Sequence, residues 1–161
     1  MAVMPIKEIG NPVLRTETNK VEKFDDNIQD LITNLIDTLR ANDGLGLAAN
    51  QIGILKQVAV IEVENELIKL INPEIIEKKG NEIREEGCLS VPGRQGPVPR
   101  ATEIAVKYKD ENGREIEKKF ADLTARVIQH EIDHLQGELF VDKIVDISAG
   151  LDLGEQIKEL D

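Results

Sequence analysis

The sequence contains few aromatic residues, one cysteine and two histidines among its 161 residues. A single cysteine cannot form an internal disulfide bond, so no disulfide framework supports the fold. The net charge of −11 disfavours contact with a phosphate backbone. With so few aromatic side chains a base-stacking platform is also excluded, and we expect no direct binding of nucleic acid. The aromatic residues are Phe24, Tyr108, Phe120 and Phe140.

The sequence also has no long hydrophobic run. No stretch approaches the roughly 20 apolar residues that a membrane-spanning helix needs. Residues 1–20 lack the apolar core of a signal peptide. A cysteine thiolate that binds a metal favours a reducing compartment. We therefore expect a cytoplasmic protein that does not enter a membrane.

Hydrophobic periodicity predicts one domain, residues 1–161, of the α+β class. Residues 27–41 have apolar side chains at helical spacing and end at Asn42-Asp43-Gly44. We expect mixed or antiparallel sheets packed around a central helix that contains both histidines of the chain, with an N-terminal helix and a C-terminal tail. Strands are predicted at Val58–Val63, Leu67–Ile71, Ile75–Lys78, 104–108 and 116–120, with a hairpin turn at residues 110–113.

Both histidines lie in one string, His130-Glu131-Ile132-Asp133-His134. Residues four apart project from the same face of a helix, so both imidazoles can bind one metal ion. Glu131 then lies where it can accept a proton from a coordinated water. Asp122 is the expected N-cap of this helix, and Gly137 is its expected C-terminal stop.

Helical spacing divides this predicted helix into three strips. Leu123 and Val127 share a sector with the two histidines, and a second apolar sector lies opposite. A helix that is apolar on two sides is enclosed, so we expect buried and rigidly held histidines. The opposite apolar sector contains Ala125, Ile128, Ile132 and Leu135, and the polar strip contains Arg126, Gln129, Asp133 and Gln136.

The third metal ligand has three candidates in the sequence. Phe140 stands where one class of zinc peptidases has a third histidine, which leaves Cys88 or a later glutamate, Glu155 or Glu159. Cys88 follows Glu85-Glu86-Gly87, where a thiolate is costly unless a cation compensates its charge. Leu89-Ser90-Val91 is expected to be a short extended segment that ends at Pro92-Gly93.

A third segment, Gly44 to Gly53, contains small residues and no charge. It suits close backbone packing or a ligand that lies against the chain, and a tight turn after a helix is the alternative. Its spacing differs from that of a nucleotide-binding glycine loop.

Together the three segments resemble the peptide deformylase family. GLGLAANQ, EGCLS and QHEIDH occur in the family's order, and Gly10-Asn11-Pro12-Val13-Leu14-Arg15 is similar to its N-terminal signature. The resemblance covers about residues 5–145 and leaves 146–161 as an acidic tail. It implies hydrolysis of the formyl group of formyl-methionyl nascent polypeptides, with release of formate.

By this resemblance, Cys88, His130 and His134 would bind the metal, with water in the fourth position and Glu131 as general base and acid. Fe²⁺ would be the metal in the cell, and Zn²⁺, Ni²⁺ or Co²⁺ can substitute. Gln51 and the backbone N–H of Leu89 would stabilise the oxyanion. The implied substrate-binding residues are Leu45, Gly46, Glu86, Gly87, Leu123 and Val127.

The sequence departs from the family pattern at three arginines and in the tail. The family has an arginine one residue after Arg94, and Arg84 and Arg126 occupy positions where some members are apolar. The tail is acidic, so we expect ribosome proximity to be transient and not to depend on a basic helix. Its charged residues are Asp146, Asp152, Glu155, Glu159 and Asp161 against Lys158.

Two other functions are compatible with the residues alone. A different metallopeptidase would cleave internal peptide bonds and take Glu155 or Glu159 as its third ligand. A structural zinc protein would use Cys88, His130 and His134 with a fourth protein ligand, and it would unfold when the metal is removed.

Overall fold

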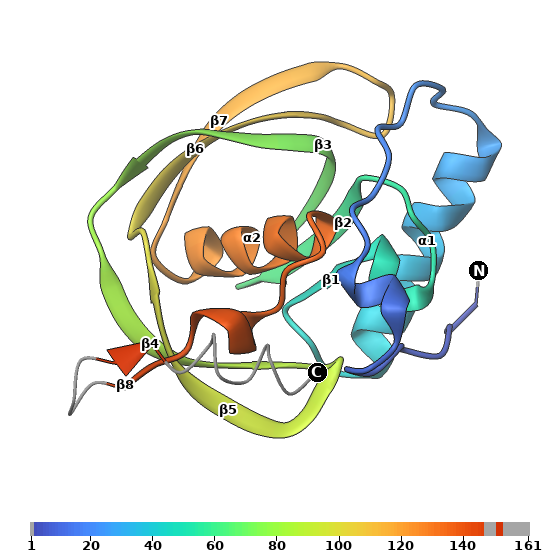
Figure 1. Ribbon diagram of the computed structural model, residues 1–161. Helices are drawn as coiled ribbons and strands as arrows, with labels where there is room; N and C mark the ends of the chain where they lie inside the picture. The colour runs from blue at the N-terminus through green and yellow to red at the C-terminus, as the bar shows by residue number, and fades with distance from the viewer. Residues whose placement is uncertain (1, 147–150, 153–161) are drawn as a thin grey trace.

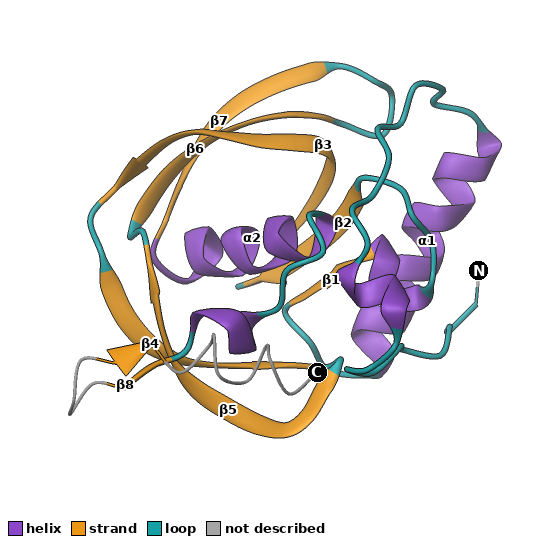
Figure 2. Cartoon of the chain, in the orientation of Figure 1, coloured by secondary structure: helices purple, strands orange, loops and turns teal. Residues whose placement is uncertain are grey.

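The computed structural model describes residues 2–146 together with residues 151 and 152. Its helices are α1 (Asp26–Ala41) and α2 (Asp122–Leu135), with 3-10 helices η1 (Pro12–Arg15), η2 (Ala49–Ile52) and η3 (Phe140–Lys143). Its strands are β1 (Gly46–Ala48), β2 (Val58–Val63), β3 (Glu66–Lys79), β4 (Glu82–Cys88), β5 (Val91–Arg100), β6 (Glu103–Lys109), β7 (Glu115–Ala121), β8 (Val145–Asp146) and β9 (Leu151–Asp152). Figures 1 and 2 show their arrangement.

Helix α2 lies at the centre of the molecule, between two sheets (Figure 1). The larger sheet is antiparallel with the order β1-β2-β3-β6-β7, so β1 is an edge strand. The smaller sheet is the β4–β5 ribbon. The α+β architecture around a central helix is confirmed.

Helix α1 confirms the helix predicted at residues 27–41. Asp25 is its N-cap, because the Asp25 side chain accepts a hydrogen bond from the backbone N–H of Ile28 at 3.3 Å. The apolar face of α1 packs against β1, β2 and η2 in one core cluster. The buried apolar residues of this face are Ile28, Leu31, Ile32, Leu35 and Leu39.

Helix α2 is enclosed as its sequence predicts. Every residue from Ala125 to Leu135 is buried, the polar ones included. Its start differs from the prediction, because Ala121 takes the N-cap position and Asp122 has a φ of 54°. The stop at Gly137 is confirmed. Gly137 has a φ of 79°, and a Cβ there would lie 2.7 Å from the carbonyl oxygen of Arg15.

The strands predicted at Leu67–Ile71 and Ile75–Lys78 are one continuous strand, β3. The pairing of β3 with β6 shifts register between Ile71 and Glu74, which is the gap between the two predicted strands. Asn72 lies in this irregularity with a φ of 52°, and its side chain exchanges hydrogen bonds with the backbone of Val21. The bulge keeps β3 in the sheet although Pro73 offers no N–H.

The prediction of a short extended segment at Leu89–Val91 that ends at Pro92-Gly93 was wrong. Leu89 and Ser90 form the turn between β4 and β5, and β5 continues through Pro92 and Gly93. The ribbon tolerates these residues because its register shifts between Gly87 and Cys88, which leaves residues 92–94 of β5 without paired residues in β4.

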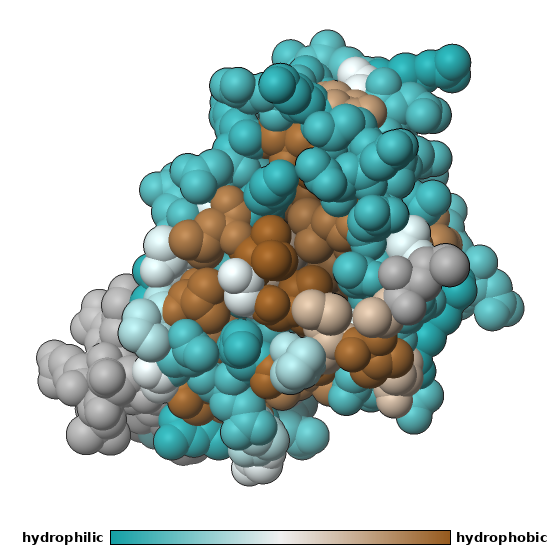
Figure 3. Space-filling model, turned by 90° about the vertical axis from the view of Figure 1, so that its right-hand side faces the viewer, coloured by the Kyte–Doolittle hydropathy of each residue, from teal (hydrophilic) through white to brown (hydrophobic). Residues whose placement is uncertain are grey.

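The predicted tail is described only in part. Strand β8 pairs with β9 through Val145↔Asp152 and Asp146↔Leu151. The candidate ligands Glu155 and Glu159 lie outside the described residues. Within the described part of the chain, neither helix is long and apolar enough to cross a membrane. Figure 3 shows one face on which apolar side chains gather at the centre and hydrophilic ones surround them.

Candidate metal centre

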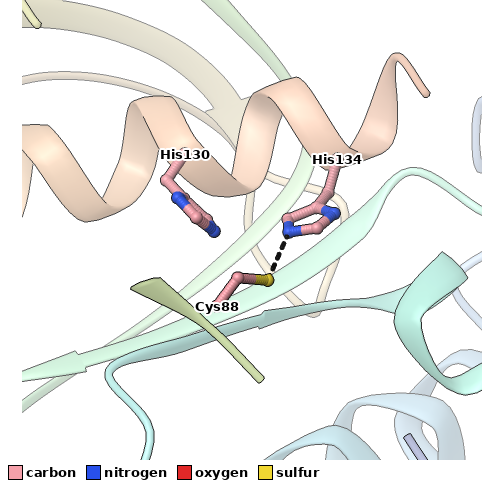
Figure 4. Close-up of side chains that lie close together, drawn as sticks. All are labelled: Cys88, His130 and His134. Atoms are coloured by element: carbon pink, nitrogen blue, oxygen red, sulfur yellow. Dashed lines mark hydrogen bonds between the residues drawn. The ribbon is translucent and has the colours of Figure 1, made fainter. Parts of the chain in front are cut away.

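The structure brings together the two histidines of α2 and the cysteine at the end of β4. The ligand atoms of Cys88, His130 and His134 all lie within 4.8 Å of one another. Figure 4 shows both rings pointing from α2 toward the Cys88 sulfur, with His134 Nε2 3.2 Å from Cys88 Sγ. Residues 46 positions apart in the chain therefore converge because the β4–β5 ribbon packs against α2.

The thiol of Cys88 is held by neighbours from two motifs. The backbone N–H of Ser90 donates to Cys88 Sγ at 3.4 Å, and the Gln51 amide donates to it at 3.6 Å. Gln51 is itself fixed, because its Oε1 accepts from the backbone N–H of Ala48 at 2.9 Å and its Nε2 donates to Ser90 Oγ at 3.0 Å. The loop of η2 thus reaches the sulfur directly.

His130 is oriented by Glu86. Its Nδ1 lies 2.9 Å from Glu86 Oε1, which leaves Nε2 on the side of Cys88 and His134. Glu86 also accepts hydrogen bonds from the guanidinium groups of Arg100 and Arg126. Burial alone would raise the pKa of Glu86, but the hydrogen bonds from His130 and Arg100 outweigh it and hold this pKa far below its usual range.

His134 is fully buried. Burial, together with the charge of His130, lowers the pKa of His134 well below its ordinary value. The imidazole is therefore neutral at neutral pH, the form that binds a metal. Asn50 fixes the end of the helix here, because its side-chain amide donates to the backbone carbonyl of His134.

The charges around His130 fit a bound cation. Burial by itself lowers the pKa of His130, but its contacts with Cys88 and Glu86 and the charge of Glu131 raise it well above its ordinary value. These groups stabilise a proton on the ring when no other cation is near, and a divalent ion would take the same role. One sulfur and two imidazole nitrogens form a donor set that zinc, ferrous iron, nickel and cobalt accept.

Glu131 lies beside this cluster. Its side chain is buried, and its Oε2 lies 4.0 Å from His130 Nε2. Within residues 2–146, no group hydrogen-bonds to Glu131 Oε1. Burial raises the pKa of Glu131 to about 7, which suits a group that gains and loses a proton near neutral pH.

A cavity of about 530 Å³ opens in front of the three candidate metal ligands. It lies between β1, β4 and the first turns of α2. His134 is not among its lining residues, so this histidine lies behind the other two ligand candidates. The lining includes all the other residues that the family resemblance assigns to catalysis, substrate binding or metal binding: Leu45, Gly46, Gln51, Glu86, Gly87, Cys88, Leu89, Leu123, Val127, His130 and Glu131.

The three arginines at which the sequence departs from the family pattern lie in different places. Arg126 lines this cavity, whereas Arg84 is exposed and pairs with Glu82 at 2.5 Å. Arg94 lines only a neighbouring hollow, and Gln95 lines both that hollow and the main cavity.

Sequence reasoning missed a buried ionic network behind the site. Arg100 binds Glu86 through two hydrogen bonds and also bonds to Asp133. Lys143 lies 3.1 Å from the same Asp133 carboxylate. The available signal was weak: an arginine after Pro97-Val98-Pro99, and an aspartate inside a helix that is otherwise enclosed.

Comparisons with known proteins identify the family of this chain. The family described as "Polypeptide deformylase" matches residues 3–149. A peptide deformylase of Caldanaerobacter subterraneus subsp. tengcongensis is 46% identical over 145 residues, which are 90% of this chain and 91% of that protein.

Solved structures show the same likeness. The crystal structure of peptide deformylase from Thermotoga maritima is 41% identical with a TM-score of 0.89, covering 91% of this chain and 100% of that one. A Synechococcus elongatus peptide deformylase in complex with actinonin is 40% identical with a TM-score of 0.87, covering 97% and 85%. This chain therefore belongs to the polypeptide deformylase family, metal-dependent hydrolases that remove the formyl group from N-formylmethionyl peptides.

Proposed function

We propose that Cys88, His130 and His134 bind the catalytic metal of this deformylase and that Glu131 is its general base and acid. The observation that carries the proposal is the convergence of the three ligand atoms within 4.8 Å of one another, next to a cavity that Glu131 also lines. A structural zinc site with a fourth protein ligand is less well supported. The metal-ligand cluster of the described residues has three members, and two of them line an open cavity.

The metal, Glu131 and Glu86 have different roles in the proposed reaction. When bound, the metal supplies a Lewis acid and lowers the pKa of water to about 7. Glu131 takes the proton from the attacking water on a carboxylate oxygen and then delivers it to the amine nitrogen of the departing peptide. The group is suited to both steps because burial holds its pKa at about 7. Glu86 keeps the ring of His130 in one orientation throughout.

We assign the stabilisation of the oxyanion, which forms on the formyl oxygen in the transition state, to the side-chain amide of Gln51 and to the backbone N–H of Leu89. The amide of Gln51 is held by Ala48 and Ser90, so only its long 3.6 Å hydrogen bond to Cys88 Sγ has to be exchanged when negative charge develops on the formyl oxygen. Loss of one such donor typically costs about 2.7–4 kcal/mol of transition-state stabilisation.

The rest of the cavity would recognise the peptide. Gly46 belongs to edge strand β1, and Gly87 belongs to β4, so an extended substrate can pair with the backbone between them. Leu45, Leu123 and Val127 supply an apolar pocket for an unbranched methionine side chain. The carbon of a formyl group carries only a hydrogen atom, so tight walls around the three metal ligands would admit a formyl group and exclude the larger acetyl group.

The metal, compartment and cellular context are also proposed. Fe²⁺ is our choice for the metal in the cell, because the family resemblance favours it, and the sulfur and nitrogen donors also accept zinc, nickel and cobalt. A thiolate ligand and an iron ion that is sensitive to oxidation both favour the cytoplasm. The substrates would be nascent chains that leave the ribosome, which the enzyme approaches transiently, without a basic tail.

An anaerobic assay of formyl-Met-peptide hydrolysis, with the metal content measured on the same sample, tests this proposal. Wild-type protein should hold about one divalent ion per chain and release formate. The Glu131→Gln variant should hold the same amount of metal and lose about 100- to 10,000-fold in turnover. Near-full activity of that variant would remove Glu131 from the mechanism.

A further inference from the structure

Arg126 lies one helical turn before His130 on α2, and it is a buried cation with three hydrogen bonds. Its Nη1 donates to Glu86 Oε2 at 2.6 Å and to the Val98 carbonyl at 2.9 Å. Its Nη2 donates to the carbonyl of Glu82 at 2.6 Å. One side chain therefore ties α2 to both strands of the β4–β5 ribbon, and 7% of Arg126 remains exposed.

The carboxylate of Glu86 receives bonds on both oxygens. Oε1 lies 2.9 Å from His130 Nδ1 and accepts from Arg100 Nη2 at 3.0 Å. Oε2 accepts from Arg100 Nε at 2.9 Å and from Arg126 Nη1 at 2.6 Å. The two arginines thus fix the plane of the carboxylate, and this plane determines where Oε1 meets the ring of His130.

Charge balance in this buried network depends on Arg126. Arg100 is shared between two carboxylates, because it also bonds to Asp133. Without Arg126, one arginine would serve both Glu86 and Asp133 inside the protein, with Lys143 at the edge of the network. Removal of one partner leaves a buried carboxylate with uncompensated charge, which is strongly destabilising in the original arrangement. For Glu86 that would change the bond that orients His130.

We propose that Arg126 is a positioning residue for the metal ligand His130, acting through Glu86. The inference rests on the proposed function, in which His130 binds the metal. Arg126 also lines the cavity next to Leu123 and Val127. The residue therefore belongs to the wall that the substrate meets and to the support of the metal centre.

Co²⁺ titration of the metal-free full-length protein tests this role, with absorption spectra recorded in the visible range. In wild-type protein Co²⁺ should bind tightly and give bands of a thiolate-ligated ion. The Arg126→Met variant should bind Co²⁺ about 10- to 100-fold more weakly and shift those bands, because the ring of His130 is no longer held in place. Arg84→Met is the matched control, because Arg84 is an exposed arginine on β4 that pairs with Glu82, and it should keep wild-type affinity.

The possible outcomes separate this inference from the proposed function. If wild-type protein does not bind Co²⁺, the ligand assignment fails. If wild-type protein binds and a folded Arg126→Met variant has the same affinity and spectrum, Arg126 does not position His130, even if its melting temperature falls. Should Arg126→Met not fold, Arg126→Gln keeps a donor for the Val98 or Glu82 carbonyl, and unchanged Co²⁺ affinity in that variant overturns the inference.

Discussion

Gly46 and Glu131 lie so close together that no side chain fits between them. A Cβ atom on Gly46 would lie 2.8 Å from Glu131 Oε2 and 2.9 Å from Glu131 Cγ. It would also lie 2.9 Å from Val127 Cγ1. The glycine therefore allows edge strand β1 to approach the helix that carries the proposed general base.

Gly46→Ala should displace Glu131 and reduce deformylation by about 100-fold, because small displacements of a catalytic group are costly. Overpacking should also lower the free energy of unfolding by about 1–3 kcal/mol. Steady-state kinetics, metal content and denaturant unfolding measure these effects. For stability, Gly87→Ala is the control, because its Cβ would meet only ordinary contacts, the nearest at 3.4 Å. Wild-type turnover in Gly46→Ala would show that this contact does not hold Glu131 in place.

Cys88→Ala tests the third ligand. If the thiolate binds the metal, its removal should weaken metal affinity by more than about 100-fold, beyond what loss of a supporting residue costs. Competition with a chelator measures the affinity, and circular dichroism checks the fold. Ser90→Ala is the control, since it removes the hydroxyl that holds the Gln51 amide but keeps the backbone N–H that donates to the sulfur, and it removes no proposed ligand. Metal affinity that survives in Cys88→Ala would point to a glutamate such as Glu155 or Glu159.

The parts of the site that could be predicted from the sequence depend on local spacing. His130 and His134 are four residues apart on a helix with two apolar sides, so their shared face and their burial followed from periodicity. From the residues alone Cys88 was one of three candidates, and the resemblance to peptide deformylases selected it. Its approach to the histidines depends on the packing of the β4–β5 ribbon against α2, which no local pattern encodes.

The network around Glu86 could not be predicted for the same reason. Arg100 meets Glu86 across the ribbon and meets Asp133 across the interface with α2, and both contacts depend on strand register. The prediction of two separate strands in place of β3 was wrong for a different reason. Asn72 and Pro73 look like a turn in sequence, but hydrogen bonds between the Asn72 side chain and Val21 keep the strand continuous.

Glu86 should make stability depend on pH. Its pKa in the folded protein lies below the ordinary value of 4.5, so its ionised form is bound more favourably by the folded state. This contribution is complete above about pH 4.5 and is lost as the pH falls toward the lower folded-state pKa. In Glu86→Gln, unfolding free energy should be lower at pH 7 and fall less steeply below pH 4.5. Urea unfolding at several pH values measures the slope, and identical slopes in both proteins would contradict the assignment.

The apolar pocket predicts a change in specificity. Val127 lines the cavity between Leu123 and Glu131, so Val127→Phe would fill space that the methionine side chain should occupy. We expect kcat/KM for a formyl-Met peptide to fall by at least about 10- to 200-fold, the range that a change of one methylene in an apolar pocket already produces. A formyl-Gly peptide has no side chain there and should lose less.

The ratio of the two kcat/KM values is the decisive measurement, because a general loss of metal or of folding would lower both equally. Ile83→Phe is the control, since Ile83 is 46% exposed on β4 and is not among the lining residues of the cavity. It should leave the ratio unchanged. An equal loss for both substrates in a Val127→Phe variant that is folded and holds its full metal content would place the methionine side chain elsewhere.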